Sequence, residues 1–192
     1  MRYADRPSWL MFVDEPWVLV MALYLRDVAG LTPVHDGPVL PPLDPFVPAE
    51  PAGVDVAAAS AQWSAWWSDA LRVGDVAELV PPGFPAFDHA PELQALLRRH
   101  FAAANGWAAQ RKREHVPLAV GPEAADLGGL VRAVEVELGR TAAPFELRIT
   151  ELPVAGKELW VLAADDVVVS RALFADAAEF LHRLAPVVRA LA

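Results

Sequence analysis

The stretch FELRIT at residues 145–150 decides the fold, because it opens a C-terminal quarter in which every local signal agrees. Its apolar residues Phe145, Leu147 and Ile149 alternate with polar ones, so they share one face of a β-strand. A segment rich in turn residues follows at 153–157. The chain is therefore expected to reverse direction there.

Two more strands are predicted after that turn. LWVL at 159–162 is apolar throughout, so we expect this strand to be covered on both faces. Asp165-Asp166 is typical of a tight turn, and VVV at 167–169 predicts a short β-branched strand. Three strands joined by short turns predict an antiparallel meander.

A helix is predicted to close the chain. Asp176 followed by Glu179 is a capping box, the typical start of a helix. Pro186 lacks an N–H donor and is expected to kink or restart the helix. The apolar face that would lie on the sheet consists of Phe180, Leu184, Val187, Val188 and Leu191.

The segment before residue 140 is predicted to be mainly helical. Pro16 and two preceding acids open the first helix, and glycines end several of the others. The expected helical segments are 17–28, 55–74, 91–105, 107–113 and 123–138. A short strand at 9–13, or one at 118–120, would add to the C-terminal sheet.

The predicted fold class is therefore α+β, with about five N-terminal helices, a three-stranded antiparallel β-meander and a C-terminal helix. A length of 192 residues suits one globular domain spanning residues 1–192. Within it, residues 1–140 would form the mainly helical part and residues 141–192 a βββα unit.

Seven of the nineteen residues from 33 to 51 are proline, which rules out regular structure there. Its interspersed apolar residues favour an extended strap over the helical core. The alternative is a PxxP-type ligand for a partner domain, although the flanks lack the basic residue that such ligands carry.

Trp63, Trp66 and Trp67 lie at helical spacing within the predicted helix 55–74. The spacing favours a packed core face. An exposed aromatic cage or stacking platform is the alternative, and the sequence leaves the choice open.

The net charge is −9, and it is concentrated in the first half of the chain. Residues 1–96 hold 4 basic and 13 acidic side chains, whereas residues 97–192 hold 12 of each. An acidic half repels nucleic acid and favours a protein partner with a basic surface. The single basic run at 111–113 is therefore expected to be a solvated helix end.

The chain contains no cysteine, and its longest apolar run covers only residues 17–25. Such a run is too short to span a bilayer, and neither a basic leader nor a cleavage site accompanies it. We therefore expect a cytoplasmic protein without a membrane partner.

The sequence contains no nucleotide-binding glycine pattern and no paired-histidine zinc motif, so no cofactor and no metal are expected. The candidates for catalysis are two acid–histidine pairs in predicted loops, Asp88-His89 and Glu114-His115. Solvated loop side chains are the favoured explanation of both pairs.

The favoured hypothesis is a non-catalytic protein-interaction domain with an acidic N-terminal half, which would bind a basic partner or form a homodimer. The alternative is a small enzyme or ligand-binding protein with a site between the helices and the sheet. A concave pocket lined by two or more of the four candidate residues would favour the alternative. An exposed aromatic patch would favour the interaction domain.

Overall fold

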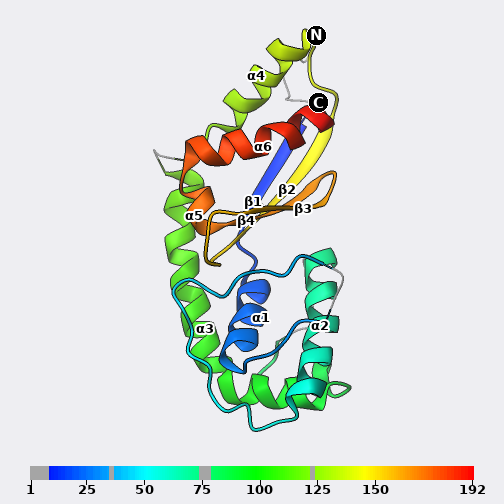
Figure 1. Cartoon of the computed structure of the whole chain (residues 1–192), viewed down its shortest axis with the longest axis vertical. Helices are drawn as coiled ribbons and strands as arrows, with labels where there is room; N and C mark the ends of the chain where they lie inside the picture. The colour runs from blue at the N-terminus through cyan, green and yellow to red at the C-terminus, as the bar shows by residue number, and fades with distance from the viewer. Residues whose placement is uncertain (1–8, 35–36, 74–78, 122–123) are drawn as a thin grey trace. The chain divides into compact units, whose positions relative to one another are not determined.

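The computed structural model describes residues 9–34, 37–73, 79–121 and 124–192, and Figure 1 labels its helices and strands. Packing contacts divide the chain into two compact units. Unit 1 combines the segment ending at Asp14 with residues 115–152 and 156–192, and unit 2 consists of residues 15–114 and 153–155. The single domain expected from the chain length stays a prediction.

A four-stranded mixed sheet forms the centre of unit 1. Its strands are β1 (Trp9–Asp14), β2 (Phe145–Leu152), β3 (Leu159–Ala163) and β4 (Asp166–Ser170), in the order β1-β2-β4-β3. β2 runs parallel to both β1 and β4, and only β3 and β4 pair antiparallel. The predicted three-stranded antiparallel meander is therefore wrong, although the three strands lie where the sequence placed them.

The meander fails because β4, rather than β3, is the strand covered on both faces. Val167, Val168 and Val169 of β4 are at most 1% exposed, whereas Val161 of β3 is 57% exposed. A continuous β-branched run is typical of an inner strand with parallel neighbours. β4 takes that inner position beside β2, and β3 becomes the edge.

β1 completes the sheet at its other edge, where the sequence allowed a short strand at residues 9–13. Trp9 pairs with Phe145, and the two strands then stay in register as far as Asp14 and Thr150. The predicted order, in which the helices come first and the strands last, is therefore wrong at the N-terminus too. Among the described residues, four α-helices lie between β1 and β2 in the chain.

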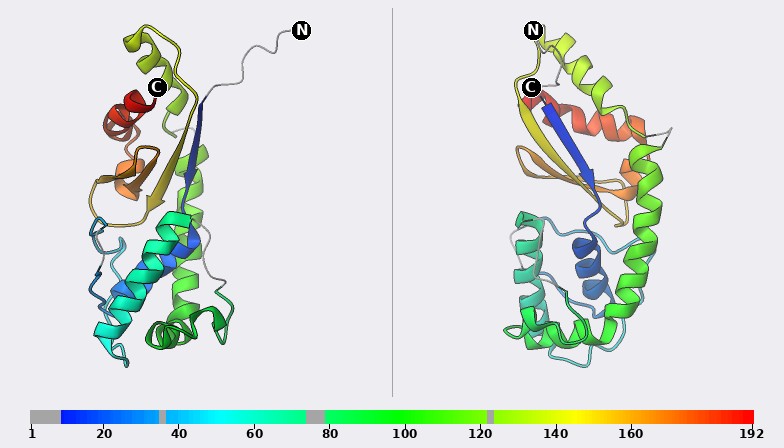
Figure 2. Two further views of the ribbon diagram at one scale, coloured as in Figure 1. Left: turned by 90° about the vertical axis from the view of Figure 1, so that its right-hand side faces the viewer. Right: turned by 180° about the vertical axis from the view of Figure 1, so that it is seen from behind.

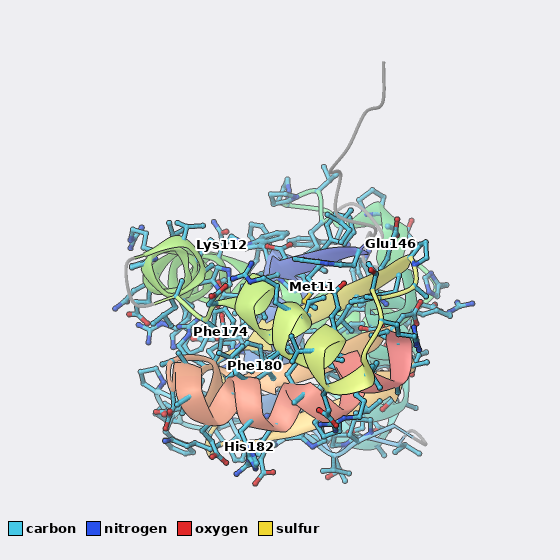
Figure 3. The ribbon with its side chains drawn as sticks, turned by 90° about the horizontal axis from the view of Figure 1, so that it is seen from above. Met11, Lys112, Glu146, Phe174, Phe180 and His182 are labelled. Atoms are coloured by element: carbon cyan, nitrogen blue, oxygen red, sulfur yellow. The ribbon has the colours of Figure 1, made fainter. Side chains whose placement is uncertain are left out.

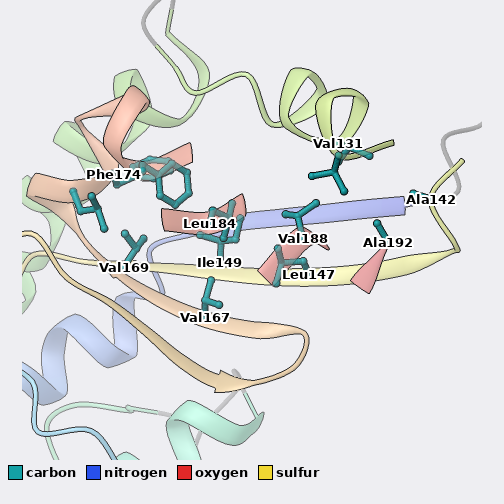
Figure 4. Close-up of a cluster of buried hydrophobic side chains, with 13 residues drawn as sticks. Val131, Ala142, Leu147, Ile149, Val167, Val169, Phe174, Leu184, Val188 and Ala192 are labelled. Carbon is teal, nitrogen blue, oxygen red and sulfur yellow. The ribbon is translucent and has the colours of Figure 1, made fainter. Parts of the chain in front are cut away.

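α4 (Leu127–Leu138) and α6 (Ala177–Leu191) pack side by side on one face of this sheet (Figures 2 and 3). The short helix α5 (Arg171–Phe174) leads from β4 into α6. Figure 4 shows the buried side chains between the layers, with Val131 of α4 and Leu184 of α6 above Ile149 of β2. Burying each such side chain stabilises the fold by roughly 1.5–3 kcal/mol.

Asp126 determines where α4 begins. Its carboxylate accepts a hydrogen bond from the backbone N–H of Gly129 at 2.7 Å. A Cβ at position 129 would lie 2.4 Å from Asp126 Oδ2, so glycine leaves the room that this cap needs. α4 ends at Gly139 (φ 65°) as predicted, while the predicted start at residue 123 lies outside the described residues.

The capping box predicted for the last helix is confirmed. The side chain of Asp176 accepts a hydrogen bond from the backbone N–H of Glu179 at 3.2 Å. α6 then passes through Pro186 without restarting.

Unit 2 is helical, with α1 (Trp17–Val28), α2 (Val56–Val73), the 3-10 turn η1 (Pro85–Phe87) and most of α3 (Pro91–Val120). Trp63, Trp66 and Trp67 are 1%, 6% and 1% exposed, so the aromatic stripe is core. The rings of Trp63 and Trp67 stack at 5.3 Å, and Trp63 Nε1 donates to the backbone oxygen of Ala22 at 2.7 Å. This burial excludes the exposed cage and the stacking platform.

α3 is one helix of 30 residues, where the sequence predicted two shorter segments and a loop. Asn105 and Gly106, the predicted stop, lie inside it, and residues 118–120 are helical rather than a strand. Glycine in a helix interior costs roughly 1 kcal/mol. Buried Leu93 and Leu97 and the hydrogen bond from Trp17 Nε1 to Asn105 Oδ1 (3.1 Å) offset that cost.

The proline-rich segment is fixed to α1 by side chains that bind its backbone. Arg26 donates to the backbone oxygens of Leu40 at 2.9 Å and Pro41 at 2.7 Å. Asp27 accepts from the backbone N–H of Leu43 at 2.7 Å, and the Leu43 side chain is 2% exposed. These contacts belong to a packed segment rather than to a free PxxP peptide.

Candidate functional site

A pocket of about 460 Å³ opens in unit 2 between α2 and the turn that joins η1 to α3. This volume lies within the range typical of small-molecule sites. The pocket lies between helices, not between helices and sheet. Its lining consists of Ala61, Gln62, Ala65, Trp66 and Asp69 from α2, and of Ala86, Phe87, His89, Ala90 and Leu93 from the η1–α3 segment.

The pocket is open because four of these residues are alanine. Methyl side chains on both walls leave the gap unfilled, while the larger side chains are packed into the core behind it. Trp66 and Phe87 meet edge to face, with ring centroids 5.4 Å apart and planes at 90°. These two buried rings give the pocket a rigid aromatic wall.

The polar groups of the pocket differ in how strongly they are held. Gln62 is fixed, because its Oε1 accepts from the backbone N–H of Leu93 at 3.0 Å and its Nε2 donates to Glu92. Asp69 is exposed and pairs with Arg72 at 2.6 Å. His89 is exposed at the rim.

His89 is the one of the four sequence candidates that lines this pocket. Its neighbour Asp88 has a different role, because its carboxylate accepts from Gln94 Nε2 at 2.7 Å. The same amide group donates to the backbone oxygens of Gly83 and Phe84, at 3.1 and 3.0 Å. Asp88 and Gln94 thus hold the turn that positions His89.

Glu114 and His115 lie within α3 and not in a loop. Twenty-three residues of helix separate Pro91 from Glu114, which places Glu114 roughly 35 Å along the axis from the pocket end. Glu114 pairs with Arg111 at 2.9 Å. The structure therefore does not bring Asp88, His89 and Glu114 together into one site.

His115 belongs to a buried polar cluster in unit 1. Its Nδ1 lies 2.8 Å from Oε2 of Glu151, a β2 residue that is 0% exposed. Arg171 of α5 donates to both oxygens of the same carboxylate, from Nε at 2.8 Å and from a terminal nitrogen at 3.2 Å. The imidazole also stacks on Phe174, with ring centroids 6.0 Å apart.

The polar groups of this cluster bind one another. Two donors from Arg171 and one contact from His115 occupy the Glu151 carboxylate, so it is not poised as a general base. A buried carboxylate that is fully paired fixes the positions of the elements that carry its partners. Sequence reasoning missed Glu151 and Arg171, and the one signal was an acidic residue directly after the predicted strand 145–150.

His100 is a third histidine in a structural setting. Burial lowers its pKa, the positive charge of Arg99 lowers it further, and Glu50 opposes the shift. Its Nε2 is buried without a hydrogen-bond partner among the described residues. The residue is only 5% exposed.

Comparison of the chain with protein-family models, with curated proteins and with solved structures finds no match. Among the described residues, no group of three or more His, Asp or Glu side chains is arranged to hold a metal ion. The described helices include none that is long and apolar enough to cross a bilayer. The function must therefore be argued from the surfaces and sites of this chain alone.

Proposed function

We propose that the chain is a non-catalytic protein-interaction domain whose binding element is the edge strand β1, and that its partner is a second copy of the chain. The observation that carries this proposal is the exposure of two large apolar side chains on that strand. Leu10 is 47% exposed and Phe12 is 50% exposed. Trp9, Met11 and Val13 alternate with them and pack against the core of unit 1.

β1 lacks the devices that normally keep an edge strand from pairing. Proteins protect such edges with charges, prolines or bulges. β3, the opposite edge, has a register shift between Val161 and Ala163. β1 pairs in unbroken register with β2 and has no charged residue before Asp14. Figure 2 shows β1 at the edge of the sheet.

The sequence of β1 is complementary to itself. Antiparallel pairing centred on Met11 places Leu10 of one copy opposite Phe12 of the other on the same face. On the opposite face, Trp9 meets Val13. The two sheets would then continue as one sheet of eight strands, with both helical layers on one side.

Salt dependence separates a second copy from a basic partner. Each copy has a net charge of −9, so the two copies repel one another and added salt strengthens their association. Binding to a basic partner is weakened by the same salt. A strand pair of six residues is a small interface, so we expect a weak and concentration-dependent dimer.

Analytical ultracentrifugation from about 1 μM to about 1 mM protein tests the proposal, since Kd values in that range correspond to weak association. The wild-type chain should dimerise more readily at high salt. Phe12→Lys should remain monomeric, whereas the matched control Val161→Lys, on the opposite edge, should dimerise like the wild type. A monomer at every concentration, or a dimer that tolerates Phe12→Lys, would overturn the proposal.

A further inference from the structure

The pocket between α2 and the η1–α3 turn is not explained by an interaction strand in unit 1. We infer that it is a binding site for a small aromatic amine. This inference is independent of the proposed function, because all its residues lie in unit 2 and β1 lies in unit 1.

The shape and wall of the pocket favour a flat apolar ring. Its volume of about 460 Å³ is enough for a single-ring molecule. Ala65 and Ala90 leave the space, and Trp66 and Phe87, at 6% and 2% exposure, form a wall supported from behind by the core. Such a wall does not have to reorganise when a ring packs against it.

The charges of the pocket favour a cation over an anion. Asp69 lines it, and Glu92 accepts a hydrogen bond from the lining residue Gln62. Among the described residues that line the pocket, none is a lysine or an arginine. Arg72 is the neighbouring cation, and it is paired with Asp69. A ligand ammonium can share that carboxylate, whereas a ligand carboxylate would be repelled by it.

His89 supplies a further polar contact. It is exposed at the rim of the pocket and can exchange a hydrogen bond with the ligand.

Tyramine and 4-hydroxyphenylacetate form a matched pair of probes, because they share the ring and hydroxyl group and differ in the charge of the side chain. We expect isothermal titration calorimetry on the full chain to show tyramine binding with a Kd of about 1 mM or tighter. 4-Hydroxyphenylacetate should bind more weakly, by up to about fivefold, since an exposed ion pair contributes no more than roughly that factor.

Three variants connect the binding to the pocket. Ala65→Leu fills it and should abolish tyramine binding, whereas Ala57→Leu, at an exposed position on α2 outside the pocket, should leave binding unchanged. Asp69→Asn should remove the preference for the amine without abolishing binding of the ring. Circular dichroism checks that each variant is folded.

Three results would overturn the inference. They are no heat or thermal shift with tyramine up to about 10 mM, well above the Kd expected for a weak ligand; equal binding of the two probes by the wild type; and undiminished binding by Ala65→Leu. None of them bears on the β1 proposal, which is measured by the mass of the assembly without any ligand.

Discussion

Replacing Glu151 by glutamine removes the negative charge at the centre of the buried cluster while keeping its shape. The carboxylate is in contact with three nitrogens, Nδ1 of His115 at 2.8 Å and two of Arg171 at 2.8 and 3.2 Å. A glutamine offers one acceptor, and its NH₂ group faces donors. Two charge-assisted hydrogen bonds at roughly 1.5 kcal/mol each are lost. We therefore expect the free energy of unfolding of unit 1 to fall by about 3 kcal/mol. This agrees with the cost of breaking a buried ion pair, roughly 3–5 kcal/mol.

Urea unfolding followed by circular dichroism measures this loss, and hydrogen exchange at the amides of β2 and β4 locates it. Glu146→Gln is the matched control, because Glu146 is exposed on the same strand and its substitution should change stability by less than about 0.5 kcal/mol. The double variant Glu151→Met with Arg171→Met should recover most of the loss, since it leaves no unpaired charge. If Glu151→Gln is as mild as Glu146→Gln, the cluster does not stabilise unit 1 and this reasoning is refuted.

Three further predictions concern single residues. Gly129→Ala should destabilise the chain by about 1 kcal/mol in thermal unfolding, because a Cβ there displaces the Asp126 cap, whereas Gly128→Ala should be better tolerated since its nearest neighbour is the flexible end of an arginine at 3.3 Å. Because the folded pKa of His100 is lowered by burial, stability should fall as the pH drops below the unfolded value of 6.5, and His100→Gln should flatten that slope in urea titrations between pH 7 and pH 5. Arg26→Met should cost about 2–3 kcal/mol and speed proteolytic cleavage within residues 37–51, because two backbone carbonyls lose their donor.

Local signals in the sequence located most elements. The Asp176 capping box and the alternation at 145–150 depend on neighbours within a few residues, and the structure has them where expected. The turn predicted at Asp165-Asp166 lies one residue earlier, at 164–165. The pairing of the strands does not depend on such neighbours. The short turn between β3 and β4 predicts that these strands pair, and they do. No local sequence signal predicts that β2 pairs with β4 instead of β3.

The three consecutive valines of β4 are the sequence feature that could have corrected the predicted topology. A strand apolar on both faces belongs inside a sheet, and both 159–162 and 167–169 met that description in sequence. Segment 159–162 contains side chains that can stay partly exposed at an edge, as Val161 does. The second contains three β-branched residues and fits the inner position. The sequence alone did not rank these two features.

The candidate site was only partly predictable for a similar reason. Asp88 and His89 were singled out together because they are adjacent, but adjacent side chains point in different directions, and only His89 reaches the pocket. The pocket itself is created by alanines, which carry no chemical signal in a sequence. Glu114 and His115 fall just beyond the predicted helical segment 107–113 and were therefore expected in a loop, but α3 continues to Val120 because packing overrides local preference.

The division of the chain into two units also changes the argument from charge. The acidic excess belongs to residues 1–96 in the sequence, but unit 2 includes α3 up to Glu114 and with it five of the basic residues from the second half. Unit 2 therefore holds 12 acidic and 7 basic side chains, and unit 1 holds 13 and 9. An asymmetry along the chain is thus not an asymmetry between the units. The hypothesis of a basic partner therefore loses its main support. Self-association through the exposed apolar edge of β1 does not depend on this charge asymmetry. The sign of the salt dependence of association decides between them, because only a partner of the same charge binds better when salt is added.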